Sequence, residues 1–310
     1  MTVRMPEIET FLSANGWQGA KTQPLAGDMS TRRYLRVSRH GKTAVLMMAQ
    51  TGQQSFIDMT GWLLSLGLRA PDILAVDPDL RLVLLGDLGD VSLRRYFDDA
   101  PHAMAGVFHD LSVLLLTIRR ARPPKLAQPS APELVTMTRL ADEFYPGIEP
   151  EGLTGFRSVL QTGLDELAEV NATVSLRDFH SENIQWQAGE TGLRQFGLLD
   201  YQDAFLVHPV YDVMSILTDA RRAVSAAEKD QFLSIYLAQS GDDGAAFRKA
   251  FSLFSAQRNL RILGIFARAG RHSDLALPYR YFCDAMDHPV FADIRDETIH
   301  AIPTPRELAT

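Results

Sequence analysis

The sequence has little cysteine, no long uninterrupted apolar run and no excess of basic residues. Its single cysteine, Cys283, excludes an internal disulfide framework and a metal site built from cysteines. We find no apolar run that approaches the roughly 18 residues of a membrane span, and no apolar core of a signal peptide at the N-terminus. We therefore expect a cytoplasmic protein that has no membrane partner. The 38 acidic against 31 basic residues give a net charge of −7, which argues against nucleic acid as a partner.

The 310 residues, 46% of them hydrophobic, are enough for a sizeable core divided between two lobes. Residues 1–86 predict a small β-rich lobe, with a helix near 6–15, strands at 34–38 and 42–49, a helix at 54–66, and strands at 73–77 and 80–85. The polar stretch Gly86–Asp90 is the candidate hinge. Residues 87–310 predict a larger lobe that is mostly helical.

Apolar residues recur at helical spacing in most of this second lobe, at 93–97, 103–120, 131–145, 152–171, 210–219, 226–240, 245–269 and 275–286. Between residues 174 and 199 the pattern is instead that of a short hairpin. A small β-rich lobe, a hinge and a helical lobe that carries one hairpin predict an α+β, bilobal fold like that of protein kinases.

Three polar residues near this hairpin predict chemistry. Asp178 precedes Asn183 by five residues, and Asp200 follows an apolar run 17 residues later. Phosphoryl transfer needs these residue types, because Mg²⁺ prefers oxygen ligands and takes only one or two from the protein. Asn183 and Asp200 would hold the metal, and Asp178 would accept the proton of the attacking hydroxyl. A single Asp in a loop is usually a turn former or a helix cap, so the prediction depends on the three residues as a set.

Two segments, Leu176–Asn183 and Leu199–Asp203, resemble the catalytic segments of the aminoglycoside phosphotransferase and choline kinase superfamily. The usual pattern there is His-Gly-Asp-x-His-x-x-Asn, followed by Ile-Asp-Trp or a similar triplet. The resemblance implies ATP and Mg²⁺ as cofactors, with Asp178 as base. It also marks as candidate catalytic residues Arg177, which replaces the glycine of the pattern, and His180, for which a loop-stabilising hydrogen bond is the safer role.

The segment Leu25–Tyr34 fits a strand, a loop over the nucleotide phosphates and a second strand. Gly27 would permit a close approach of the backbone, and Ser30 and Thr31 offer hydroxyl groups. The segment is not a Walker loop, because it lacks the Gly-Lys-Ser/Thr ending and a following helix. Taken alone, Gly-Asp is a common turn.

Kinase-like proteins normally carry a lysine on the third strand, where it holds the α- and β-phosphates. Here the strand from Thr43 to Ala49 has methionine at that place, and Lys42 lies too far back. We expect Arg32 or Arg33 to hold the phosphates, since a planar guanidinium suits phosphate oxygens. An exposed strand edge is the alternative interpretation of both arginines.

The adenine of ATP is expected at the hinge. Backbone groups near Asp87 and Leu88 would bind it, and side chains there carry little information.

Several departures from the superfamily pattern, including Leu176-Arg177-Asp178 and the segment Tyr211–Arg221, resemble the branch of bacterial anomeric sugar kinases. This resemblance implies a small-molecule substrate, an amino sugar phosphorylated at its C1 hydroxyl. The alternatives are an aminoglycoside or amino-alcohol kinase and a non-catalytic nucleotide-binding module. Asp212 is expected to support the catalytic loop or to cap its helix, and Asp203 to act behind the metal ligands or to contact substrate.

Arginines near the C-terminal end bear on the choice of substrate. Arg258, Arg261, Arg268 and Arg271 recur in one predicted helix and the residues just beyond it, and Arg261 and Arg268 would share a face. They would either meet an anionic substrate or form a solvated stripe.

Overall fold

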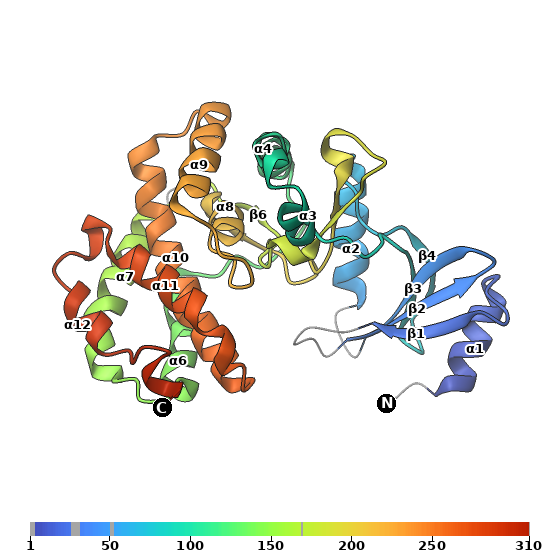
Figure 1. Cartoon of the computed structure of the whole chain (residues 1–310), viewed down its shortest axis with the longest axis horizontal. Helices are drawn as coiled ribbons and strands as arrows, with labels where there is room; N and C mark the ends of the chain where they lie inside the picture. Colours follow the sequence, from blue (N-terminus) through green and yellow to red (C-terminus); the bar gives the residue numbers. More distant parts are fainter. Residues whose placement is uncertain (1–3, 26–31, 50–52, 169, 310) are drawn as a thin grey trace. The chain divides into compact units, whose positions relative to one another are not determined.

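A computed structural model of the chain describes residues 4–25, 32–49, 53–168 and 170–309 (Figure 1). The chain falls into two compact units, each built from two stretches of sequence. The first unit contains Met1–Leu93 and Asn183–Asp203, and the second contains Arg94–Glu182 and Ala204–Thr310.

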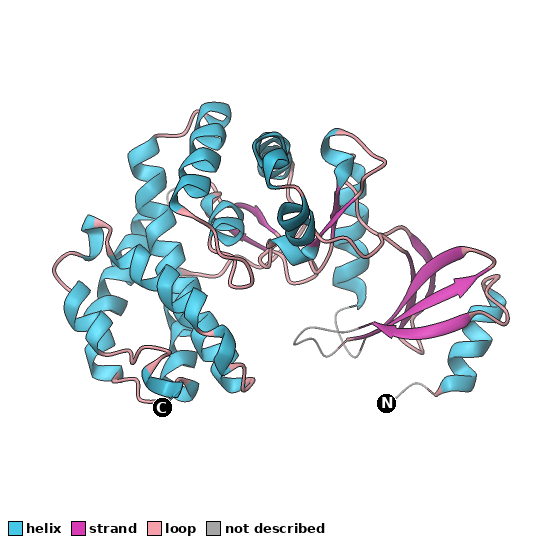
Figure 2. Cartoon of the chain, viewed as in Figure 1, coloured by secondary structure: helices cyan, strands magenta, loops and turns pink. Residues whose placement is uncertain are grey.

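An antiparallel sheet of five strands is the centre of the first unit (Figure 2). Helix α1 (Met5–Ala14) buries Ile8 and Phe11 against one face of this sheet, where Val37 and Leu46 are fully buried. Side chains alternate along a strand, so Arg36 lies on the opposite face from Val37. The strands lie in the order β1-β2-β3-β5-β4, with bounds β1 Lys21–Leu25, β2 Arg33–Arg39, β3 Lys42–Met48, β4 Ile73–Asp77 and β5 Leu82–Gly86.

A short hairpin, β7 (Ile184–Trp186) and β8 (Phe196–Leu198), also belongs to the first unit. Two backbone hydrogen bonds tie it there: the Leu198 amide donates to the Arg69 carbonyl at 2.8 Å, and the Trp186 amide donates to the Val91 carbonyl at 2.7 Å. The domain boundary between residues 86 and 87 stays a prediction. The compact units divide the chain differently, after Leu93, and they place the hairpin with the sheet, to which these bonds join it.

Helices make up most of the second unit (Figure 2). The 25-residue helix α10 is buried along much of its length. A Cβ atom at Gly264 would lie 2.4 Å from the backbone of Leu140, so glycine is what allows α10 to approach α6 so closely. The bounds are α3 Leu93–Asp99, α4 Met104–Arg120, α5 Ala131–Thr136, α6 Leu140–Phe144, α7 Thr154–Leu167, α8 Val210–Leu217, α9 Ala226–Ser240, α10 Gly244–Arg268, α11 Ala276–Met286 and α12 Arg295–His300. Helix α2 (Gln53–Ser65) belongs to the first unit, and a strand pair, β6 (Thr173–Ser175) with β9 (Phe205–Val207), belongs to the second.

One segment, Pro101–Arg120, is long and apolar enough to cross a membrane by length and composition alone. In the structure its helix α4 packs against α9 and buries Val107 and Leu111, as a core helix does. The prediction that no stretch approaches this length was wrong here. His109 and Asp110 interrupt the apolar run, but the mean hydropathy of the segment stays as high as that of a membrane-spanning helix.

The predicted α+β fold class, a β-rich N-terminal part followed by a mostly helical remainder, is confirmed. Some helix bounds differ from the prediction. The helix expected at 131–145 is divided into α5, a 3₁₀ turn and α6, and the one expected at 152–171 begins with a 3₁₀ turn and ends at Leu167. Helix α12 was not predicted, because its six residues are mostly polar.

Candidate active site

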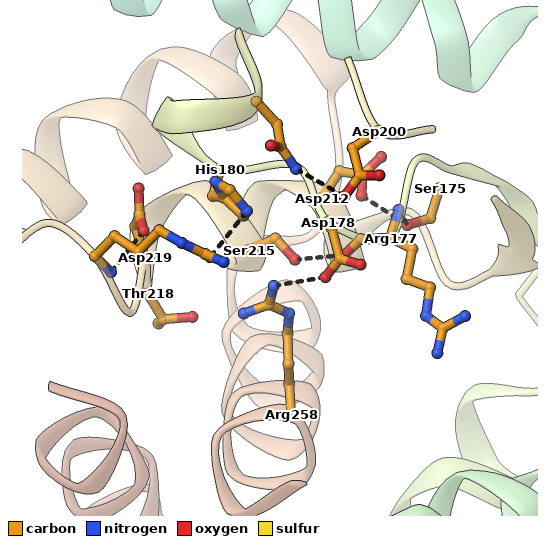
Figure 3. Close-up of polar contacts among 12 residues, drawn as sticks. Ser175, Arg177, Asp178, His180, Asp200, Asp212, Ser215, Thr218, Asp219 and Arg258 are labelled. Carbon is orange, nitrogen blue, oxygen red and sulfur yellow. Dashed lines mark hydrogen bonds and ion pairs between the residues drawn. The ribbon is translucent and has the colours of Figure 1, made fainter. Parts of the chain in front are cut away.

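Asp178 lies in a tight loop that follows β6 in the second unit (Figure 3). The Asp178 amide donates to the Leu176 carbonyl at 2.8 Å, and the His180 amide donates to the Asp178 carbonyl at 3.0 Å. Arg177 has φ +70°, in the left-handed region that is costly for a residue other than glycine. The loop therefore needs contacts from the surrounding structure to hold it in this conformation.

A guanidinium from α10 holds the Asp178 carboxylate. Nη2 of Arg258 donates to Oδ1 of Asp178 at 3.4 Å, and Figure 3 shows Arg258 extending from its helix to this carboxylate. The Arg258 side chain is 4% exposed, whereas that of Asp178 is 41% exposed. The carboxylate is thus fixed by a buried partner and still open to solvent, as a general base must be. The solvated-stripe interpretation is wrong for Arg258, because this side of α10 is buried.

A second carboxylate, Asp212 of α8, supports the loop. It accepts hydrogen bonds from the Ser175 hydroxyl at 2.6 Å and from the Leu176 amide at 2.7 Å. The Ser175 hydroxyl oxygen in turn accepts from the Arg177 amide at 2.9 Å. Burial raises the pKa of Asp212 to about 6, although these hydrogen bonds lower it. Asp212 does not cap its own helix, so its contacts are those of a residue that supports the Asp178 loop.

Asp212→Asn is expected to change the pH dependence of stability. The pKa of Asp212 in the folded protein is raised above its ordinary 3.8, so protonation favours the folded state. This contribution is fully present below the ordinary pKa and is lost as pH rises through about 6. The free energy of unfolding of the wild type, minus that of the variant, should therefore fall between about pH 4 and about pH 7. Urea denaturation across this range measures the difference, and a constant difference would contradict the prediction.

His180 is buried and neutral. Burial lowers its pKa well below the ordinary value, and the nearby charges of Arg221 and Arg258 lower it further. Its Nε2 atom lies 2.9 Å from Nη1 of Arg221 and accepts a hydrogen bond from it. Beside it, the amide and hydroxyl of Ser181 donate to Asp219 at 3.0 and 2.5 Å. These contacts fit the loop-stabilising role expected of His180 and do not fit proton transfer.

The hairpin of the first unit brings Asn183 and Asp200 together. Nδ2 of Asn183 donates to Oδ2 of Asp200 at 3.5 Å, and Asp200 has φ +57°. The next residue, Tyr201, is fully buried: its hydroxyl lies 2.8 Å from that of Thr60, and its ring stacks on Phe56 at 5.3 Å. Tyr201 thereby anchors the strained backbone that presents the Asp200 carboxylate.

The donor atoms of this pair fit Mg²⁺. An amide oxygen and a carboxylate are the hard ligands that the ion prefers, and it needs only one or two from a protein. Asp200 is also oriented from behind, because Nε2 of Gln202 donates to its Oδ1 at 2.9 Å. The same amide donates to Asp203 at 3.1 Å. Asp203 therefore lies behind Asn183 and Asp200, which fits its expected role behind the metal ligands. No cluster of three or more His, Cys, Asp or Glu residues that could hold a metal occurs in the described part of the chain.

On the phosphate side, Arg32 is the cation beside this pair. Its Nη1 atom lies 4.0 Å from Oδ1 of Asp200, and its side chain is 10% exposed. Arg33 is exposed at the start of β2, as is Lys42 at the start of β3. Of the two methionines near the end of β3, where a lysine is usual, Met47 is fully buried and Met48 is half-buried. The rest of the predicted phosphate loop lies outside the described residues, namely Gly27, Ser30 and Thr31.

The residues of the predicted hinge are held by side chains of the first unit. Arg36 donates from Nε and Nη2 to the two carboxylate oxygens of Asp87, at 2.7 and 3.1 Å. Burial raises the pKa of Asp87, but hydrogen bonds from Arg36 and the Gly89 amide bring it below its ordinary value. The Leu88 carbonyl accepts from Nε2 of Gln187 at 2.7 Å. The backbone at which adenine is predicted to bind is therefore well ordered by local contacts.

Three residues that hold the Asp178 loop were not singled out from the sequence: Ser175, Ser181 and Asp219. Asp219 is 1% exposed and accepts hydrogen bonds from Ser181 and from the Arg221 amide. An acidic residue two positions beyond the end of the apolar helix α8 is the signal that would have pointed to it.

Comparison with known proteins identifies the family. The model of the phosphotransferase enzyme family matches residues 21–250. The N-acetylmuramate/N-acetylglucosamine kinase of Caulobacter vibrioides is 32% identical to this chain, and the match covers 83% of this chain and 84% of that protein.

Solved structures confirm the kinase-like fold. A choline/ethanolamine kinase family protein from Mesorhizobium loti matches with a TM-score of 0.66 and 15% identity, over 95% of this chain and 99% of that one. A thermostable mutant of an aminoglycoside phosphotransferase, in ternary complex with ADP and hygromycin B, matches with a TM-score of 0.64 and 15% identity, over 90% and 97%.

The family match extends from β1 into α10 and includes both the Asp178 loop and the hairpin that carries Asn183 and Asp200. The predicted superfamily and the predicted class of enzyme are thereby confirmed. This chain belongs to the phosphotransferase enzyme family.

Proposed function

We propose that this phosphotransferase transfers the γ-phosphoryl group of ATP to the C1 hydroxyl of an N-acetylated amino sugar, N-acetylglucosamine or N-acetylmuramate. The observation that carries the proposal is the 32% identity, over 83% of the chain, to a kinase named for these two sugars. The cytoplasm, where ATP is abundant, is the expected place of the reaction.

In this mechanism Asp178 is the base. It accepts the proton of the sugar hydroxyl while the hydroxyl oxygen forms its bond to the γ-phosphorus. The bond from the γ-phosphorus to the bridging oxygen breaks, and ADP leaves with that oxygen. Arg258 holds the carboxylate from its buried side, so the base is oriented before the substrate binds.

Asn183 and Asp200 would hold Mg²⁺, which when bound neutralises negative charge on the phosphate oxygens. Gln202 keeps the Asp200 carboxylate in place. Arg32, at 4.0 Å from Asp200, would take the role of the missing lysine and bind phosphate oxygens through its planar guanidinium. The backbone near Asp87 and Leu88 would bind adenine.

His180 accepts a hydrogen bond from Arg221 and holds the loop. Gly27, Ser30 and Thr31 stay predicted phosphate contacts.

A substrate panel tests the proposal. ADP release would be measured with ATP, Mg²⁺ and one acceptor at a time: N-acetylglucosamine, N-acetylmuramate, an aminoglycoside, choline or homoserine. We expect turnover with the amino sugars, and its loss when EDTA removes Mg²⁺. Turnover of the aminoglycoside or choline in place of the sugars would refute the substrate. If no acceptor is consumed while ATP still raises the melting temperature, the chain binds nucleotide without catalysis.

A further inference from the structure

Arginines gather around the proposed base in the second unit. Arg177 precedes Asp178 in the chain, and Arg258 binds its carboxylate at 3.4 Å. Arg261 follows Arg258 on α10 at a spacing of three, which places both side chains on neighbouring parts of one helix face. Arg258 pairs with the Asp178 carboxylate, while Arg177 and Arg261 lie next to this pair along the chain and along α10.

Arg258 is already paired with Asp178, but the other two arginines have no anion of their own. Among the residues that the structure describes, neither Arg177 nor Arg261 forms an ion pair with a carboxylate. The guanidinium of Arg177 lies over the Phe205 ring at 5.9 Å, and Figure 3 shows it pointing away from Asp178.

Arg261 is half-buried. Burial lowers its pKa, the charges of Arg177 and Arg258 lower it further, and Tyr211 and Asp178 partly oppose these effects. The guanidinium is therefore within electrostatic reach of both arginines and of the base. An arginine side chain stays protonated in a protein, so this charge is held partly out of water, and among the described residues it forms no ion pair of its own.

We infer that Arg177 and Arg261 form an anion subsite beside Asp178, which binds a carboxylate carried by the substrate. A carboxylate would supply the counter-charge that both arginines lack, and a guanidinium binds it through two parallel hydrogen bonds. This inference rests on the proposed function, because of the two sugars only N-acetylmuramate carries a carboxylate. The same charges would repel a cationic substrate such as an aminoglycoside or choline.

Arg261→Gln is the direct test, with Arg177→Gln as a second variant. We expect kcat/KM for N-acetylmuramate to fall about 10- to 100-fold, mainly through KM, because a hydrogen-bonded charge pair is lost. N-acetylglucosamine has no group for this subsite, so its kcat/KM should change by much less. The matched control is Arg268→Gln, an exposed arginine of the same helix, which should change either value by no more than about twofold.

Comparing the two sugars also shows whether the arginines bind the carboxylate of the substrate or the transferred phosphoryl group. An equal loss with both sugars would show that the arginines act on the transferred phosphoryl group, and it would overturn the inference. No loss with either sugar would also overturn it. Calorimetric binding gives a readout that does not need turnover: the wild type should bind N-acetylmuramate more tightly than N-acetylglucosamine, and the variants should lose this preference. If the wild type turns over neither sugar, the proposed function fails, and the binding preference still decides the subsite.

Discussion

Replacing Asp178 by asparagine is expected to lower kcat for sugar phosphorylation by about 10²- to 10⁴-fold. The amide cannot accept the proton of the attacking hydroxyl, but its oxygen can still accept the hydrogen bond from Arg258, so the loop should keep its conformation. The affinity for ATP and the melting temperature should stay close to those of the wild type. Steady-state kinetics, together with nucleotide titration and thermal unfolding, measure the three quantities.

The control for this variant is Asp293→Asn, an exposed carboxylate of the same unit. It should leave kcat unchanged. If the Asp178→Asn enzyme turned over the sugar at the wild-type rate, Asp178 would not be the catalytic base.

Asp200→Ala is expected to lower kcat by about 10²- to 10³-fold, as the loss of one group that stabilises transition-state charge does. It should also raise the Mg²⁺ concentration needed for half-maximal activity, because one of the two protein ligands is lost. Rates measured over a Mg²⁺ series give both values. Asp178→Asn should leave this Mg²⁺ requirement unchanged, so the two variants separate the base from the metal ligand.

Asp79→Asn, an exposed turn residue of the same unit, is the matched control and should alter neither quantity. An unchanged Mg²⁺ requirement in Asp200→Ala would mean that the metal is held by other residues.

The sequence predicted the parts of the site that depend on spacing along the chain. Asn183 and Asp200 lie at the two ends of one short hairpin, so the turn between them was enough to place them together. Asp178 lies in the loop just before that hairpin, where the local pattern of apolar and polar residues is also readable.

Contacts between distant segments were not predictable in this way. Arg258 is 80 positions from Asp178 in the sequence. Its charge predicted a solvent-exposed side chain, whereas in the structure this side of α10 is buried. Asp219 supports the loop from just beyond α8, and a buried acid has no periodic signature of its own. Asp212 of α8 was expected to support the loop because its segment resembles the family pattern, not because of any periodicity.

The difference between local patterns and contacts of distant segments also explains which parts of the fold were predicted. Alternation and helical spacing located the sheet and most helices, since each pattern is carried by the element itself. The assignment of residues 183–203 to the first unit depends on backbone bonds from Leu198 and Trp186 to Arg69 and Val91, which no local pattern encodes.

The central claim, transfer of a phosphoryl group from ATP to the C1 hydroxyl of an amino sugar, is tested most directly by the structure of the product. A ³¹P–¹H correlation spectrum of the reaction of the wild-type enzyme with ATP, Mg²⁺ and N-acetylglucosamine identifies the carbon that carries the phosphate. We predict a new phosphorus resonance coupled to the anomeric proton. A phosphorus resonance coupled to the protons at C6, or the release of inorganic phosphate alone, would contradict the claim.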